Sequence, residues 1–262
     1  MKLYHYTNLA SVIGIIKQGR SLEFWASRYD CMNDPFDFQF AWNRIRPIII
    51  KAAQREKLHK FETKEIAVHP YIVSFSSKED DFLMWRLYNA KVCLILDSEY
   101  FERQALDYVL RKCEYIADSK KELYDAYHAI NADIQFIPNI HMYSGRISTF
   151  IKNEAFRVEN EVRLATWYYY EHDEKITISN QRKNNYFENG MFYTRIGPDG
   201  KIVIYKKFPI DGNALVGIIV HTYSEIEFES IREALRSVLI QNGFSRDVFD
   251  NIRPTSAYPF NL

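Results

Sequence analysis

Strand and helix patterns follow one another irregularly along this chain of 262 residues. A strand pattern at Lys2–Tyr6 leads into a helix pattern that begins near Leu9, with Thr7 or Asn8 as its cap. The second half carries strand patterns in succession, at Glu161–Tyr168, Lys175–Ser179, Met191–Ile196, Lys201–Phe208 and Ala214–Val220. The sequence Gly197-Pro198-Asp199-Gly200 predicts a hairpin between two of them. Regular alternation of strands and helices would predict a doubly wound sheet, so this order favours an α+β fold.

We expect a single domain over residues 1–262, because no linker, internal repeat or low-complexity tract divides the sequence. The segment from about 100 to 153 is mostly helical in pattern and predicts a helical insertion within that domain. Further helices are expected from about Phe38 to Lys64, with a break or kink at Pro47, and over Ile226–Gln241.

Charge and hydropathy exclude several classes of protein. Lys and Arg together number 34, as do Asp and Glu, so there is no basic surplus for tight, sequence-blind binding to nucleic acid or membranes, although a local basic patch remains open. No apolar stretch approaches the length of a membrane span, and we expect a cytoplasmic protein with no membrane partner. Cys31, Cys93 and Cys113 form no C-x-x-C pair and are expected to be reduced packing residues.

The first strand pattern contains a histidine among apolar residues. His5 and Thr7 lie two apart, so their side chains share one face of the strand. An unpaired polar group in a core costs about 2–7 kcal/mol on the harsher transfer scales, which suggests a purpose. A histidine and a hydroxyl on one face could hold the diol of a ribose; the alternative is a histidine at the core edge, bonded to backbone.

A second polar cluster lies on the strand pattern past the middle of the chain. Glu159, Glu161 and Arg163 are expected on one strand face. A solvated face with an Arg–Glu pair would explain them without any function. The functional alternative is chemistry at the anomeric carbon of a sugar, where Glu161 would stabilise the positive charge that develops, with Arg163 or Glu159 orienting it.

Three further patterns supply candidate site residues. Ser74 and Ser76 share one face of an expected interior strand. Trp85 and Tyr88 lie three apart on a helix pattern, where they either pack the core or stack on a flat ring. The turn Asn33-Asp34-Pro35-Phe36 could carry Asn33 and Asp34 into a cleft.

Several familiar signatures are missing from the sequence. It has no P-loop, no G-x-G-x-x-G, no G-x-S-x-G and no H-E-x-x-H, and its seven histidines show no metal-ligand spacing. We therefore expect no metal cofactor. A metal nuclease built on Asp34, Glu159 and Glu161 is a remote alternative.

The landmarks, taken in order, resemble those of an uncharacterised bacterial domain family. They are Tyr4-His5-Tyr6-Thr7, Asn33-Asp34-Pro35-Phe36, Ser74-Phe75-Ser76 with Met84-Trp85 and Tyr88, Glu159 to Arg163, and Ser256-Ala257-Tyr258. More distantly, the pattern is similar to the ADP-ribosyltransferase superfamily. That resemblance implies a split mixed or antiparallel sheet with flanking helices, and NAD as the substrate.

The same resemblance implies a role for each matching residue. His5 and Thr7 would hold the NAD ribose, Ser74 or Ser76 would brace the site, Tyr88 or Trp85 would stack on nicotinamide, and Glu161 would drive glycosidic cleavage. The sequence departs from the superfamily in combining a His-type first motif with a Ser-x-Ser middle motif.

The expected function is cleavage of the nicotinamide–ribose bond of NAD and transfer of ADP-ribose to a macromolecule, either nucleic acid or protein. Such a protein would act as a toxin or phage-defence effector, and an antitoxin or other neutralising partner is expected. Two alternatives are an NAD glycohydrolase and a catalytically inactive nucleotide-binding or regulatory module.

Overall fold

The computed structural model describes residues 1–32, 34, 36–55, 66–104, 108–117, 119–134, 137, 139–171, 192–197 and 200–257. The expected strand at Lys175–Ser179 lies outside these residues, as does Asn33. The strands are β1 (Lys2–Thr7), β2 (Ile16–Lys17), β3 (Ser21–Arg28), β4 (Ile66–Ser76), β5 (Val92–Asp97), β6 (Val109–Lys112), β7 (Glu114–Ile116), β8 (Ile151–Asn153), β9 (Glu161–Glu171), β10 (Tyr193–Ile196), β11 (Ile202–Asp211), β12 (Leu215–Val220) and β13 (Ile252–Pro254). The helices are α1 (Leu9–Ile15), α2 (Asp37–Arg55), α3 (Phe82–Leu87), α4 (Glu99–Gln104), α5 (Lys120–Asn131), α6 (Ile140–Ser148), α7 (Glu225–Gln241) and α8 (Arg246–Asp250).

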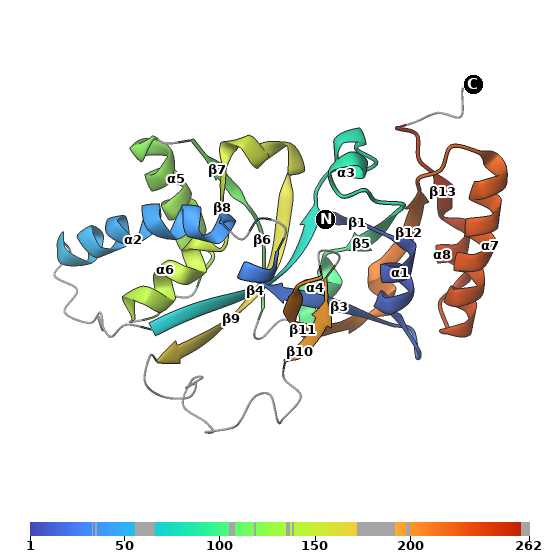
Figure 1. Cartoon of the computed structure of the whole chain (residues 1–262), viewed down its shortest axis with the longest axis horizontal. Helices are drawn as coiled ribbons and strands as arrows, with labels where there is room; N and C mark the ends of the chain where they lie inside the picture. The colour runs from blue at the N-terminus through green and yellow to red at the C-terminus, as the bar shows by residue number, and fades with distance from the viewer. Residues whose placement is uncertain are drawn as a thin grey trace.

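Most strands join one sheet, whose main path runs β10-β11-β3-β4-β1-β5-β12-β13. Its ladders are antiparallel except that between β12 and β13, which is parallel. Helices flank this mixed sheet at both ends of the molecule (Figure 1). The expectation of an α+β fold is therefore confirmed.

The sheet divides at strand β4. One edge of β4 pairs with β9 along its whole length, from Ile66↔Glu171 to Ser76↔Glu161. On its other edge β4 pairs with β3 at Tyr71 and Ile72 and with β1 only at Ser76. Strands β3 and β1 thus leave the same edge of β4 at different points, and on this edge Val73–Phe75 pair with neither strand, although they pair with β9 on the other edge.

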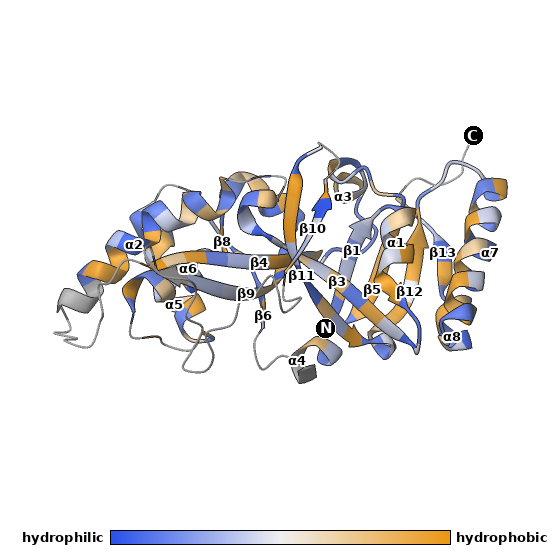
Figure 2. Cartoon of the chain, turned by 60° about the horizontal axis from the view of Figure 1, so that its bottom comes forward, coloured by the Kyte–Doolittle hydropathy of each residue, from blue (hydrophilic) through white to orange (hydrophobic). Residues whose placement is uncertain are grey.

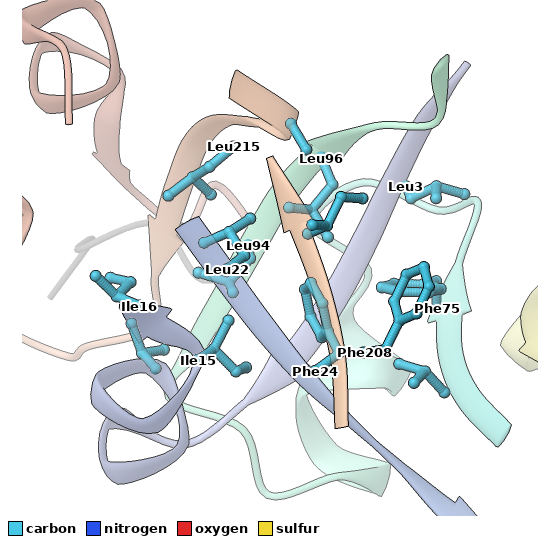
Figure 3. Close-up of a cluster of buried hydrophobic side chains, with 14 of the residues drawn as sticks. Leu3, Ile15, Ile16, Leu22, Phe24, Phe75, Leu94, Leu96, Phe208 and Leu215 are labelled. Atoms are coloured by element: carbon cyan, nitrogen blue, oxygen red, sulfur yellow. The ribbon is translucent and has the colours of Figure 1, made fainter. Parts of the chain in front are cut away.

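The larger core fills the space between the two halves that diverge from β4. Phe24 and Phe208 from β3 and β11 meet Phe75 from β4 and Leu3 and Leu94 from β1 and β5 (Figure 3). Strands β5 and β12 are apolar over nearly their whole length, as their orange colour in Figure 2 shows, and nearly all of their residues are buried. Apolar burial of this kind is the dominant favourable contribution to folding.

Helix α7 covers the far end of this core. Ser224 caps its N-terminus by accepting a hydrogen bond from the backbone N–H of Glu227. Phe228, Leu235 and Leu239 form its buried stripe, at the spacing of a helix face. The helix ends at Gln241, as the sequence pattern predicts, and Gly243 follows with a φ of +81°.

A second core lies among helices α2, α5 and α6 (Figure 1), of which α6 packs on β4, α2 packs on α6 and β8, and α5 packs on β7. Val68 of β4 and Trp167 of β9 contribute to it, together with Ile45 of α2. Helix α6 approaches β4 closely at Gly145, where an added Cβ would overlap the side chain of Val68. Only glycine permits this approach without movement of one element.

The expected helical insertion over residues 100–153 is only partly present. The segment holds α4, α5 and α6, but it also holds β6, β7 and β8, so the prediction of a mostly helical segment is wrong for these three strands. Strand β6 exists because it pairs with β9, from Val109↔Ala165 to Lys112↔Val162, and such a distant partner leaves little local signal. Helix α2 continues through Pro47 without the expected break. No helix in the described part of the chain is both long and apolar enough to cross a membrane.

Candidate functional site

A cavity of about 790 Å³ opens where β1 and β3 diverge from β4. This volume lies within the range of about 300–1,000 Å³ that is usual for small-molecule sites. Eight of the ten site residues predicted from the sequence line it: His5, Thr7, Asp34, Ser74, Ser76, Tyr88, Glu161 and Arg163. The N-terminal histidine and the distant glutamate thus belong to one cavity, as the sequence analysis requires.

Trp85 is not among the residues that line the cavity. Its ring is buried in a small core, edge-on to Tyr6 at 5.0 Å, and its Nε1 donates a hydrogen bond of 2.9 Å to Asp80. Tyr88, just after the same helix, does line the cavity, and its hydroxyl donates to Oε2 of Glu159 at 3.3 Å. Of the two candidate stacking rings, Tyr88 alone is in a position to contact a ligand there.

His5 provides a hydrogen-bond partner at Ser74, on the edge of β4 where neither β1 nor β3 pairs with it. Its Nδ1 lies 3.1 Å from the carbonyl oxygen of Ser74. Because a carbonyl can only accept, Nδ1 carries the hydrogen and Nε2 is left as an acceptor in the neutral ring. Burial lowers the pKa of His5, which keeps the ring neutral at physiological pH. His5 therefore offers the cavity a hydrogen-bond acceptor, which suits a sugar hydroxyl.

Glu161 and Arg163 form a buried ion pair. Arg163 Nε lies 3.0 Å from Oε1 of Glu161, and Arg163 Nη2 lies 3.1 Å from Oε2. Their side chains are 3% and 1% exposed, which excludes the solvated face considered from the sequence. Arg163 also contacts Asp37 and donates 2.7 Å to the carbonyl of Thr149. Arg163 thus orients Glu161, as one of the sequence-based alternatives expects, and any contact of Arg163 with a bound cofactor would compete with these three partners.

Lys152 joins the two glutamates of the cluster. Its Nζ lies 2.8 Å from Oε2 of Glu161 and 2.8 Å from Oε2 of Glu159. Burial alone would raise the pKa of Glu161, but the charges of Arg163 and Lys152 outweigh it and lower that pKa to about 2. Glu161 is therefore a carboxylate at every physiological pH and cannot serve as a proton donor.

The prediction that Glu159 shares a strand face with Glu161 is wrong. Glu159 ends a 3₁₀ helix, Glu154–Glu159, and strand β9 begins only at Glu161. Asn160 between them has a φ of +44°, a left-handed conformation that asparagine tolerates better than most residues. This turn folds the two carboxylates around Lys152, and Ser76 secures it by donating 2.7 Å to the carbonyl of Glu159.

Three buried polar atoms along the cavity have no hydrogen-bond partner among the described residues. They are Oγ of Ser74, Oδ1 of Asp37 and Nε of Arg195. Buried polar atoms in proteins are nearly always paired, so each such exception requires an explanation. A polar ligand that donates to the carboxylate and the hydroxyl and accepts from the guanidinium would satisfy all three.

The sequence analysis missed Asp37, Lys152 and Arg195, which also line the cavity. Asp37 directly follows the predicted turn and could have been included with it. Lys152 and Arg195 lie in short strands without any motif, so the sequence gives no signal for them. In the regions that the structure describes, no group of three or more His, Cys, Asp and Glu side chains is arranged to hold a metal ion.

The fold and the site together define an α+β protein with a cavity that both charged and apolar side chains line. Comparison of the chain with protein-family models, with curated proteins and with solved structures gave no match.

Proposed function

We propose that this protein is an NAD-dependent ADP-ribosyltransferase with an ADP-ribosyltransferase-like split sheet, as the sequence resemblance implies. One observation carries the proposal: His5, Ser74, Tyr88 and Glu161, which come from four segments far apart in sequence, line one cavity. The division of the sheet at β4, which opens this cavity, is a second support. We extend the proposal to a toxin or phage-defence effector that requires a neutralising protein partner.

The cavity offers complementary groups for each part of NAD. Lys152 and Arg163 are compensated by Asp37, Glu159 and Glu161, so Arg195, whose Nε has no partner among the described residues, supplies the positive charge for the diphosphate. Nε2 of His5 and Oγ of Ser74 are hydrogen-bonding atoms for ribose hydroxyls. The ring of Tyr88 provides a flat surface for nicotinamide.

The proposed reaction breaks the bond between the nicotinamide nitrogen and C1′ of the ribose. The electron pair of that bond leaves with neutral nicotinamide, and positive charge develops on the ribose. The ionised Glu161 stabilises this charge in a site of low dielectric, where such stabilisation is strongest. A nucleophilic oxygen or nitrogen of the acceptor then bonds to C1′ and releases its proton to solvent, which balances the reaction.

Labelled NAD distinguishes this proposal from its two alternatives. NAD labelled in the adenosine is incubated with the purified protein in the presence of separated RNA, DNA and protein fractions. A transferase leaves label on one of the fractions; a glycohydrolase releases nicotinamide and free ADP-ribose; an inactive module binds NAD in calorimetry without turnover. Label on no fraction would reject transfer, and the absence of both turnover and binding would reject the site.

The proposed toxin role has its own test. Induced expression of the parent protein should arrest growth, and Glu161→Gln should not, because the arrest depends on turnover at the cavity. Glu154→Gln is a matched control, since Glu154 is an exposed glutamate that also pairs with an arginine, Arg157. Growth arrest by the Glu161→Gln variant would show that toxicity does not depend on turnover at the cavity.

A further inference from the structure

A row of three aromatic rings crosses β3, β11 and β10, from the exposed Trp25 at the cavity to the buried Tyr205 and on to Tyr193. Trp25 and Tyr205 stack with ring centroids 4.7 Å apart and planes inclined by 25°. Tyr205 in turn stacks with Tyr193 at 5.6 Å and 26°. Strand register explains the row, because Tyr193 pairs with Tyr205, and Tyr205 with Ser27, two residues from Trp25 on the same face of β3.

Cationic side chains lie against both ends of this aromatic row. The Arg195 guanidinium carbon is 5.9 Å from the centre of the Trp25 ring, and Lys207 Nζ is 4.5 Å from the centre of the Tyr193 ring. Lys17 and Lys207 both approach Glu23, at 3.9 and 3.4 Å. Three cations thus share this face with one carboxylate, so the face is locally basic in a chain whose formal net charge is zero.

The aromatic row is continuous with the cavity that holds Glu161. Trp25 and Arg195 line that cavity, and the Nε of Arg195 is one of its three unpartnered buried atoms. Trp25 is 37% exposed, and its Nε1 donates 3.1 Å to Glu23, which fixes the orientation of the indole. A fixed, partly exposed indole at the entrance of a site is well placed to contact the second substrate.

We propose that the acceptor of ADP-ribose is a single-stranded nucleic acid, with a base stacked on Trp25 and a backbone phosphate against Lys207. This inference rests on the proposed function. Alternating flat rings and cations match alternating bases and phosphates, and base–aromatic stacking is how proteins hold single strands without reading their sequence. A duplex would not fit, because its bases are already stacked on one another.

Binding is measured in the absence of NAD, so the result does not depend on whether NAD is cleaved. The probe is a fluorescein-labelled DNA or RNA oligonucleotide of about 12 nucleotides, either single-stranded or annealed to its complement, followed by fluorescence anisotropy. The parent should prefer the single strand, and affinity should fall steeply as salt rises. Trp25→Ala should weaken binding about tenfold or more, and Trp25→Phe should recover most of the loss.

Two further variants keep the test decisive if Trp25→Ala disturbs the fold. Lys207→Glu reverses one charge at the far end of the row and should weaken binding and flatten the salt dependence. Tyr124→Ala removes a ring of similar exposure, 36%, from helix α5 and should bind like the parent. Equal affinity of the parent for single and double strands, or equal binding by Trp25→Phe, Trp25→Ala and Lys207→Glu, would overturn the proposal.

The transfer reaction supplies the second outcome. With labelled NAD, the parent should label the single-stranded oligonucleotide in preference to the duplex and to a protein fraction. Label on protein alone, with no affinity for the oligonucleotide, would assign the surface to a protein acceptor and reject this inference while leaving the proposed NAD chemistry intact. Oligonucleotide binding without any NAD turnover would instead retain the surface and reject the proposed function.

Discussion

The ammonium nitrogen of Lys152 lies 2.8 Å from Oε2 of Glu161, deep in the wall of the cavity. The two side chains are 7% and 3% exposed, so each charge depends on the other for compensation. The charge of Glu161 raises the pKa of Lys152, against the effect of burial, so both groups stay ionised. The charge of Lys152 thus keeps Glu161 ionised at the cavity.

Lys152→Met should destabilise the fold and should also weaken the site. Removing one partner of a buried ion pair typically costs about 3–5 kcal/mol, and without Lys152 the charge of Arg163 alone faces the carboxylates of this cluster. Urea unfolding measures that change. Arg157→Met breaks an exposed pair with Glu154 and should cost less than about 1 kcal/mol. Similar losses in the two variants would show that the buried cluster contributes no more than a surface pair.

Asn160 should control the position of both glutamates through its backbone. Asn160→Val places a β-branched side chain at a φ of +44° and should cost about 1–2 kcal/mol, with reduced nicotinamide release. Asn160→Gly also lacks the asparagine side chain but accepts this φ freely, so it should remain close to the parent. Thermal unfolding and a nicotinamide assay on both variants test the argument. If glycine were as damaging as valine, the side chain of Asn160 and not its conformation would matter.

His5 should make stability depend on pH. Burial lowers its pKa in the folded state, so below about pH 6.5 the unfolded chain binds more protons than the folded one, and stability falls as pH falls. His5→Gln should therefore lose less stability than the parent between about pH 7.5 and about pH 5.5. Because burial also lowers the pKa of His69 and His221, part of the pH dependence should remain.

Urea unfolding at both pH values measures this difference. His128→Gln, at an exposed position on helix α5, is the matched control. An unchanged pH dependence in His5→Gln would mean that burial does not lower the pKa of His5 in the folded state.

Sequence patterns predicted the elements whose signal is local. The strand at Lys2–Thr7, the helix from Leu9, the hairpin between β10 and β11 and helix α7 all combine a clear periodicity with a cap or turn residue. Strands β6, β7 and β8 were missed because each has only three or four residues and exists through pairing with a distant strand or a neighbouring segment. Local pattern cannot report such pairing.

The residues of the site likewise fall into those that a local sequence pattern indicates and those that it does not. His5, Ser74 and Glu161 could be found because a polar residue on an apolar strand is conspicuous in sequence. Lys152 could not be found, because its place beside Glu161 results from the turn at Asn160 and not from a motif. Trp85 matched the motif but lies in the core, since its helix directs Tyr88 and not Trp85 toward the cavity.

The contact between α6 and β4 gives a prediction about packing alone. Gly145→Ala should destabilise the protein by about 1–3 kcal/mol, because the new methyl group overlaps Val68. Gly14→Ala, in helix α1 with nothing within 4 Å of the new methyl group, should instead stabilise it by up to about 1 kcal/mol. Chemical denaturation compares the two. If the two variants changed the free energy of unfolding equally, α6 would be able to shift on the sheet and make room for the methyl group.

Nicotinamide release by Glu161 variants tests the central claim most directly. The purified parent should release nicotinamide from NAD, and Glu161→Gln should lower the rate by about a hundredfold or more, since it removes the charge that stabilises the ribose in the transition state. Glu161→Gln also disturbs a buried ion pair, so Glu161→Asp, which keeps the charge but withdraws the carboxylate, is measured beside it. Thermal unfolding confirms that each variant is folded, and Glu154→Gln serves as the exposed control. The account predicts that both Glu161 variants fail while Glu154→Gln retains the parental rate; folded Glu161→Gln that releases nicotinamide as fast as the parent would contradict it.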